Sequence, residues 1–146
     1  MNELMIIVEI AGRRCALNAH DVSSVIELGE VTPVPRTPDY IAGITAMRSQ
    51  SMTVIDCRLA LGIDPSPFPT DDRGAVVKVA GYPYALIVDR IDDITTSHAE
   101  PGSVSGGFGP EWSRVATGMT ETPTGPALLI DLAQLIIGPG KLGQAA

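Results

Sequence analysis

Two histidines are the residues of this chain best suited to act as a catalytic base. Hydrolases and transferases that use a nucleophile also need a base and a group that orients it, and for that base the chain offers only His20 and His98. His20 lies at the expected end of a hairpin, His98 lies shortly before a glycine-rich run, and neither stands in a catalytic motif. We therefore expect two surface histidines and no enzyme activity.

The glycine-rich run SGGFGP, at residues 105–110, invites comparison with a phosphate-binding loop. Such a loop requires a Lys-Ser or Lys-Thr ending and a strand-to-helix setting, and the run has neither. The sequence also contains no Cys-x-x-Cys, no His-x-x-x-His and no calcium-loop spacing of acids. We therefore expect no metal site and no cofactor.

Adjacent carboxylates occur twice, as Asp71 with Asp72 and as Asp92 with Asp93. Neighbouring side chains of a strand point to opposite faces, and this would separate the two members of each pair. We interpret both pairs as solvated charges in turns and not as an acid and base pair.

Arg48 is the charged residue that the pattern singles out. It follows a strongly apolar stretch in GITAMRSQSMTVIDCR, and Glu27 ends an earlier strand candidate. The two residues could form an ordinary surface ion pair, or they could fix a polar patch at a binding surface. Arginine suits the second role because its planar fork makes directional contacts. The residues alone leave both interpretations open.

An internal repeat supplies the elements that must position these residues. Residues 8–25, VEIAGRRCALNAHDVSSV, align without a gap with residues 77–94, VKVAGYPYALIVDRIDDI, so that Gly12 matches Gly81 at an offset of 69 residues. A second match, at an offset of 75, joins GIT at residues 43–45 to GMT at residues 118–120. The chain is therefore one small unit built twice, and the seam between two copies of a scaffold is a natural place for binding.

Short strands and tight turns are expected throughout, because twelve Pro and fifteen Gly divide the chain into small pieces. Hairpins are predicted over residues 4–18 and 75–88, each followed by a third strand, which in the first copy lies within residues 21–27. Further strands are predicted at residues 40–47 and 51–55.

Short helices and connectors complete the expected elements. Asp56 precedes an apolar helical turn, and Asp131 repeats this arrangement, so both are interpreted as helix N-caps. The prolines of residues 31–39 predict an extended connector. The remaining segments are predicted to be a linker between the copies at residues 62–73, a loop at residues 100–110 and a flexible tail at residues 138–146.

Composition narrows the class of partner. The net charge is −7 and the sequence pI is about 4.6, which disfavours nucleic acid and anionic membrane as partners. Cys15 and Cys57 stand in apolar contexts and are expected to be buried free thiols, as in a reducing, cytoplasmic setting. The apolar start LMIIVEI is too short for a membrane span and lacks the marks of a leader, so no direct membrane insertion is expected.

From about Glu9 to Ile137, the order and spacing of these motifs resemble the CheW family of chemotaxis coupling proteins. The most specific stretch, residues 38–58, is similar to the family pattern P-x-Y-hydrophobic-x-G-hydrophobic-x-N-L-R-G followed by P-V-I-D-L-R. The matching positions are Pro38, Tyr40, Gly43, Arg48, Val54, Ile55, Asp56 and Arg58.

The departures from the family pattern surround Arg48. Ala46, Ser49 and Thr53 stand where the family usually has Asn, Gly and Pro. Serine tolerates a positive φ less readily than glycine, so the turn after Arg48 is expected to differ from that of the family.

The resemblance implies a mainly β fold of two five-stranded SH3-like β-barrels that share a core, with short helices and no active site. It implies a single CheW-like domain at residues 1–137, with barrel subdomains at roughly 8–62 and 73–137, a linker at 63–72, and strands that can exchange between the barrels. The flexible tail follows at residues 138–146.

An adaptor function is also implied by the resemblance. In the family, one barrel end binds the regulatory domain of the histidine kinase CheA, and the groove between the barrels takes the helical hairpin tip of a chemoreceptor. By position, Glu27 and Arg48 would be the paired charges near the receptor-binding face, and Val22 and Val25 would offer apolar contacts. The protein would be cytoplasmic and would reach membrane receptor arrays through its partners.

A second function stays open beside the adaptor, because the departures surround Arg48. The chain would then be a regulatory module with the CheW fold that serves a non-standard array, for pili or development, and binds a different kinase or ligand.

Overall fold

The structure is a computed structural model that describes residues 3–47, 50–64, 72–97, 110–123 and 125–137. The first copy of the repeat forms β1 (Glu3–Ile10), β2 (Arg13–Asn18), a 3-10 turn (Ala19–Asp21), β3 (Val22–Glu27), β4 (Ile41–Met47), β5 (Gln50–Asp56) and α1 (Cys57–Ala60). The second copy forms β6 (Arg73–Val79), β7 (Tyr82–Ile87), β8 (Arg90–Ser97), α2 (Pro110–Ser113), β9 (Ala116–Thr122), β10 (Gly125–Ile130) and α3 (Leu132–Ile137).

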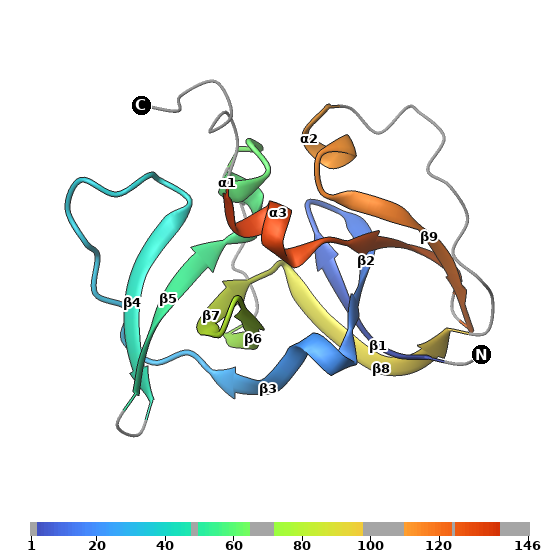
Figure 1. Ribbon diagram of the computed structural model, residues 1–146, viewed down its shortest axis with the longest axis horizontal. Coiled ribbons are helices and arrows are strands. Elements are labelled where there is room, and N and C mark those ends of the chain that lie inside the picture. The colour runs from blue at the N-terminus through green and yellow to red at the C-terminus, as the bar shows by residue number, and fades with distance from the viewer. Residues whose placement is uncertain (1–2, 48–49, 65–71, 98–109, 124, 138–146) are drawn as a thin grey trace.

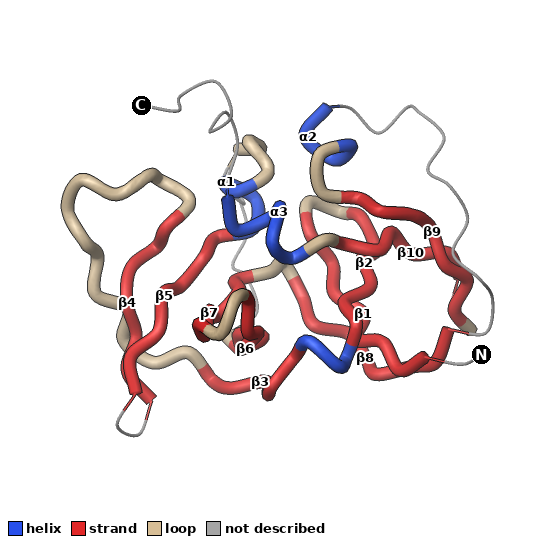
Figure 2. Tube along the Cα trace, viewed as in Figure 1, coloured by secondary structure: helices blue, strands red, loops and turns tan. Residues whose placement is uncertain are grey.

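Two five-stranded sheets contain all of these strands. Sheet A has the order β8-β1-β2-β10-β9, and sheet B has the order β3-β6-β7-β5-β4. Each sheet therefore takes its hairpin from one copy of the repeat and its other three strands from the other copy, so the copies are interlocked (Figures 1 and 2). The expected mainly β fold with short helices is confirmed.

The repeated dipeptide Ala-Gly fixes the two hairpin turns. Ala11 and Gly12 have φ values of 53° and 81°, and Ala80 and Gly81 have φ values of 54° and 86°. A positive φ at both central residues is the requirement of a type I′ turn, whose twist matches that of the flanking strands. The same two residues therefore build the same turn in both copies.

The main core lies between the sheets and is built from both. It includes Ile6 and Val8 from β1 and Val77 and Leu86 from β6 and β7, with Leu135 of α3 fully buried among them. A smaller cluster around Met5 and Ile7 belongs to sheet A alone. Another cluster around Met52, Val54, Val76 and Ala85 belongs to sheet B alone. Since β-strands alternate their faces, β1 supplies one face to the shared core and the other to sheet A's own cluster.

The proline-rich connector that follows β3 pairs with β4 at the edge of sheet B. Thr32 and Ile44 exchange two backbone hydrogen bonds of 2.9 Å, and the Thr45 hydroxyl donates to the Glu30 carbonyl at 3.1 Å. Gly43 makes this approach possible, because it has a φ of 150° and a Cβ there would lie 2.3 Å from the Thr32 carbonyl oxygen. Any larger residue would push the connector away from β4.

Several predicted features lie wholly or largely outside the described residues. These are Arg48 and Ser49, His98, the run SGGFGP, most of the linker at residues 63–72, and the tail at residues 138–146. The predicted loop at residues 100–110 needs a correction at its end, because Pro110 begins the short helix α2.

Candidate functional site

Three of the four predicted binding residues lie together on β3. Val22 is half-buried and packs against the shared core, whereas Val25 is 37% exposed. Glu27 is exposed at the end of the strand, opposite Arg73 of β6 in the strand register. Strand β3 therefore presents an apolar side chain and a carboxylate near the edge of sheet B.

Arg48, the fourth predicted residue, lies just beyond β4 and outside the described residues. Its pairing with Glu27 stays a prediction. The strand that leads to it borders a surface cavity of about 500 Å³, lined by Glu30, Thr32, Val34, Ile44 and Ala46. The Ile44 side chain is 41% exposed there. Ala46, one of the departures from the family pattern, thus lies at a surface hollow and not in the core.

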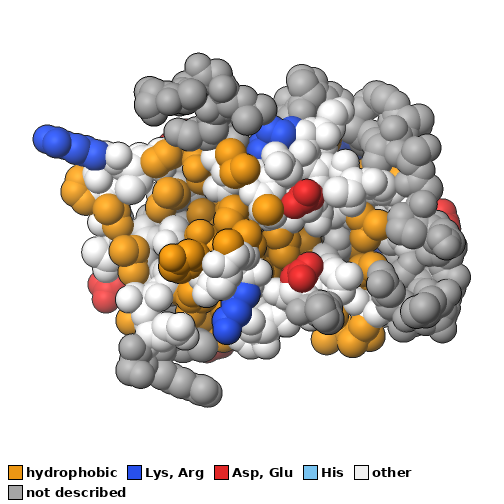
Figure 3. All heavy atoms as spheres, viewed as in Figure 1, with side chains coloured by type: hydrophobic (Ala, Val, Ile, Leu, Met, Phe, Trp, Pro, Cys, Tyr) orange, Lys and Arg blue, Asp and Glu red, His pale blue; other side chains and the backbone are white. Residues whose placement is uncertain are grey.

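Hydrophobic side chains are also prominent on one broad face of the molecule. In Figure 3 they gather over β5 and its neighbours β4 and β7, with few charged side chains among them. A surface of this kind suits a protein partner better than a charged polymer.

The two predicted helix caps are confirmed. The Asp56 carboxylate accepts hydrogen bonds from the backbone amides of Arg58 and Leu59, at 3.0 and 3.3 Å. The Asp131 carboxylate accepts from Ala133 and Gln134 at the same two distances. Both aspartates are therefore occupied in capping helices α1 and α3.

An ion pair between Arg58 and Asp89 was not predicted, although Arg58 belongs to the family pattern. The Arg58 guanidinium donates two hydrogen bonds to the Asp89 carboxylate, both 2.9 Å long. The side chains are only 18% and 17% exposed. The bonds from Arg58, together with the backbone amides of Ala11 and Gly12, lower the pKa of Asp89. The pair joins α1 to the corner before β8.

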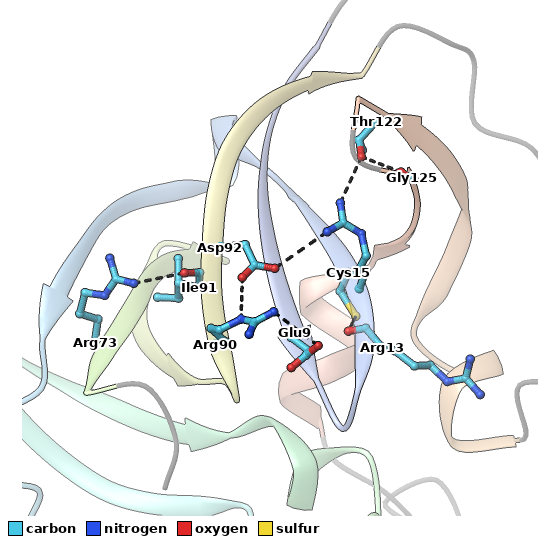
Figure 4. Close-up of polar contacts among 10 residues, drawn as sticks. Glu9, Arg13, Cys15, Arg73, Arg90, Ile91, Asp92, Thr122 and Gly125 are labelled. Carbon is cyan, nitrogen blue, oxygen red and sulfur yellow. Dashed lines mark hydrogen bonds and ion pairs between the residues drawn. The ribbon is translucent and has the colours of Figure 1, made fainter. Parts of the chain in front are cut away.

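A second polar cluster crosses sheet A (Figure 4). Arg90 contacts Asp92 at 2.7 Å and Glu9 at 3.8 Å, and Asp92 also lies 3.9 Å from Arg14. Arg14 donates a hydrogen bond of 3.2 Å to the Thr122 hydroxyl. The interpretation of Asp92 as a turn charge was therefore wrong: it lies inside β8 and contacts Arg90 of the same strand and Arg14 of β2.

Both cysteines are buried free thiols, as predicted. Burial raises the pKa of Cys15 to about 12 and raises the pKa of Cys57 well above its ordinary value. Because the thiolate is the reactive form, neither thiol is prepared to act as a nucleophile.

The described residues show neither a metal site nor a membrane-spanning helix. Among these residues, no group of three or more His, Cys, Asp or Glu side chains is placed to hold a metal ion. No helix within the described ranges has the length and apolar character needed to cross a membrane.

Comparison with known proteins identifies the fold and the family. The profile of the CheW-like domain matches residues 4–138, which include both sheets and all three helices. The chain belongs to the CheW-like domain family. Its likeness to that family therefore extends over both copies of the repeat and is not confined to the segment around Arg48.

Individual CheW relatives are distant in sequence. The chain is 27% identical over 96 residues to the chemotaxis protein CheW of Bacillus subtilis, and the matched region covers 66% of this chain and 62% of that protein. The match thus spans less than two thirds of the relative's length. The crystal structure of the scaffolding protein TtCheW from Thermoanaerobacter tengcongensis superposes with a TM-score of 0.81 at 24% identity, covering 96% of each chain. This second likeness concerns the fold.

Proposed function

We propose that this chain is a non-enzymatic adaptor of chemotaxis signalling that links a chemoreceptor to a CheA-type histidine kinase. The observation that carries the proposal is the CheW-like match over residues 4–138 together with the two-sheet fold. CheW scaffolding proteins are non-enzymatic. An adaptor works through its binding surfaces. The polar groups described above cap helices or form ion pairs, and both of these roles are structural.

The proposed receptor-binding and kinase-binding residues are Val22, Val25, Glu27 and Arg48. Support comes from β3, where an exposed valine and an exposed glutamate share one strand. The surface hollow beside Ile44 lies along the strand that leads to Arg48. A helical hairpin tip presents apolar side chains flanked by charges, and such a tip is complementary to a surface of this composition.

The proposed location is the cytoplasm, at membrane receptor arrays that the chain reaches through its partners. Interfaces of this transient class are modest in area. Arrays gain strength because many weak contacts are linked, which raises the effective concentration of each binding site. The adaptor therefore needs specific contacts more than high affinity.

Charge reversal at Arg48 tests the proposed surface. We expect Arg48→Glu to weaken co-sedimentation with receptor fragments and CheA by about tenfold or more, since it would replace the proposed ion pair with Glu27 by two like charges. Lys78→Glu is the matched control, because Lys78 is an exposed cation far from Glu27. Glu27 lies opposite Arg73 in the strand register, at one end of β6, and Lys78 lies near the other end. Equal binding of both variants and the wild type would remove Arg48 from the interface.

The same assay separates the adaptor from the regulatory module of a non-standard array. Normal affinity of the wild type for a standard CheA regulatory domain supports the adaptor. Absence of that binding, with the fold intact by circular dichroism, would favour a different kinase or ligand.

A further inference from the structure

Arg114 joins the three short helices, which lie on the same side of the molecule (Figures 1 and 2). It directly follows α2, and its guanidinium donates a hydrogen bond of 2.7 Å to the carbonyl of Ala60, the last residue of α1. A second hydrogen bond goes to the carbonyl of Gln134 in α3. The last carbonyls of a helix have no amide of the same helix to accept from. One guanidinium, with its several donors, therefore holds the ends of two helices at once.

Tyr40 holds the end of α3 from the first copy of the repeat. Its side chain packs in the shared core and is 7% exposed. Its hydroxyl donates a hydrogen bond of 2.7 Å to the carbonyl of Ile137, where α3 ends. The backbone carbonyl of Tyr40 accepts a hydrogen bond of 2.8 Å from the amide of Asp56, where β5 ends. Because β4 begins at the next residue, Tyr40 joins α3 to the strand pair of β4 and β5.

The second copy of the repeat has the same backbone bond without the side-chain bond. At the offset of 75 residues, Val115 matches Tyr40. The Asp131 amide donates a hydrogen bond of 2.8 Å to the Val115 carbonyl, just as in the first copy. Valine has no hydroxyl, so this position cannot hold a helix end through its side chain. The corner therefore forms without such a bond, and the contact of Tyr40 with α3 is an addition to the duplicated scaffold.

Strand β4 relies on its ladder with β5. It is an edge strand of sheet B, and on its outer side the structure describes one backbone bridge, between Ile44 and Thr32. The strand begins next to Tyr40 and ends next to Arg48. At a rise of about 3.3 Å per residue, its two ends lie roughly 20 Å apart. Elements with few partners are the first to open locally, so the anchoring of Tyr40 bears on the whole strand.

We propose that α3 is a latch that couples the helical side of the molecule to β4. In the latched state, which the structure shows, Arg114 and Tyr40 hold the last turn of α3, and Tyr40 fixes the start of β4. In the open state this turn is released, the buried hydroxyl of Tyr40 loses its acceptor, and β4 loosens along its length. Coupling between two sites is reciprocal. A partner that binds β4 in its latched position therefore also holds α3 in place, and release of α3 weakens binding along β4.

Amide hydrogen exchange of the whole chain tests the latch. We expect Tyr40→Phe, which removes only the hydroxyl, to speed exchange in both α3 and β4 by about tenfold and to leave β1 and β2 unchanged. Arg114→Gln should also speed exchange in both elements, although the described bonds of Arg114 go to α1 and α3. Tyr84→Phe is the matched control, because Tyr84 packs against the same core. This control should leave α3 and β4 unchanged.

The pattern of exchange separates a latch from a contact that only stabilises the fold. Faster exchange of only one of the two elements, α3 or β4, in either variant would overturn the proposal. Equal acceleration in every strand, β1 and β2 included, would overturn it too, as would no acceleration. If Arg114→Gln failed to fold, as judged by circular dichroism, Tyr40→Phe alone would decide. Since exchange is measured without kinase or receptor, failure of the latch leaves the adaptor proposal standing.

Discussion

The corner at α1 and the corner at α3 occupy matching positions in the two copies, and an ion pair between Arg58 and Asp89 ties the first. At α1, the Arg58 guanidinium donates two hydrogen bonds of 2.9 Å to the Asp89 carboxylate. The matching residues at the other corner are Ala133 and His20, so the sequence cannot form the same pair there. A surface cavity of about 310 Å³ lies at that corner, lined in part by Asp21, Lys78 and Asp131.

The difference shows which features duplication preserves and which it does not. Both corners keep the aspartate cap and the Ala-Gly turn, because these fix the backbone. The neighbouring charges are reversed, since Glu9 and Arg90 of one corner match Lys78 and Asp21 of the other. A nearly symmetric scaffold thus offers two unlike surfaces.

Removal of Arg58 should break the tied corner and have the largest effect. We expect Arg58→Ala to lower the free energy of unfolding by about 2–3 kcal/mol, because it leaves Asp89 in a largely buried place without its cation. The residual exposure of the pair keeps this below the cost for a fully buried pair. Urea denaturation measures it. Arg36→Ala is the exposed control, and an equally small effect of both variants would contradict the account.

The charge of Asp89 should make the tied corner sensitive to acid. Its pKa is lowered in the folded state, so its contribution to stability is present above the unfolded pKa of about 3.9 and is lost as the pH falls through the folded pKa. We expect Asp89→Asn to lower the free energy of unfolding by about 1–2 kcal/mol at neutral pH. The difference from wild type should shrink below about pH 4. A difference that stays constant with pH would assign the role of Asp89 to shape and not to charge.

Removal of the helix cap should lower the stability of the protein by the same amount at the two corners. Asp56→Ala and Asp131→Ala are each expected to cost about 1 kcal/mol, because each leaves two helical amides without an acceptor. Thermal unfolding of both variants and of the double variant measures this. If one cap proved far more costly than the other, the two corners would not share their backbone geometry.

Transplanting the ion pair to the α3 corner should have the smallest effect. The double variant His20→Asp with Ala133→Arg recreates the pair at the matching positions. A double-mutant cycle is expected to give a favourable coupling of about 0.5–1 kcal/mol, since a new pair near the surface gains little. An absent or unfavourable coupling would show that the two corners differ in geometry as well as in side chains.

The sequence predicted the features that depend on local residues. The two hairpins, the caps at Asp56 and Asp131 and the buried cysteines follow from residue type and near neighbours, and all three are seen. The repeat and the family pattern around residues 38–58 were sufficient to predict the mainly β fold.

The features that the sequence did not predict depend on contacts between residues far apart in the chain. The parallel contact of β2 with β10 joins residues more than a hundred positions apart, and no local pattern could reveal which strands exchange. Asp92 was misread because a pair of adjacent aspartates is typical of a turn. The sheet brings Asp92 close to Arg90 and to Arg14, and Arg14 is far away in the sequence. Arg58 matched the family pattern, but its partner Asp89 lies in the other copy.

A three-component assembly tests the adaptor most directly. Receptor fragments on vesicles are mixed with a CheA-type kinase, with or without this chain, and the kinase in the pellet is measured. We expect the chain to co-sediment and to raise the amount of kinase in the pellet, and we expect Arg48→Glu to reduce this recruitment. A folded chain that leaves the kinase in the supernatant, while a known CheW recruits it under the same conditions, would contradict the adaptor function.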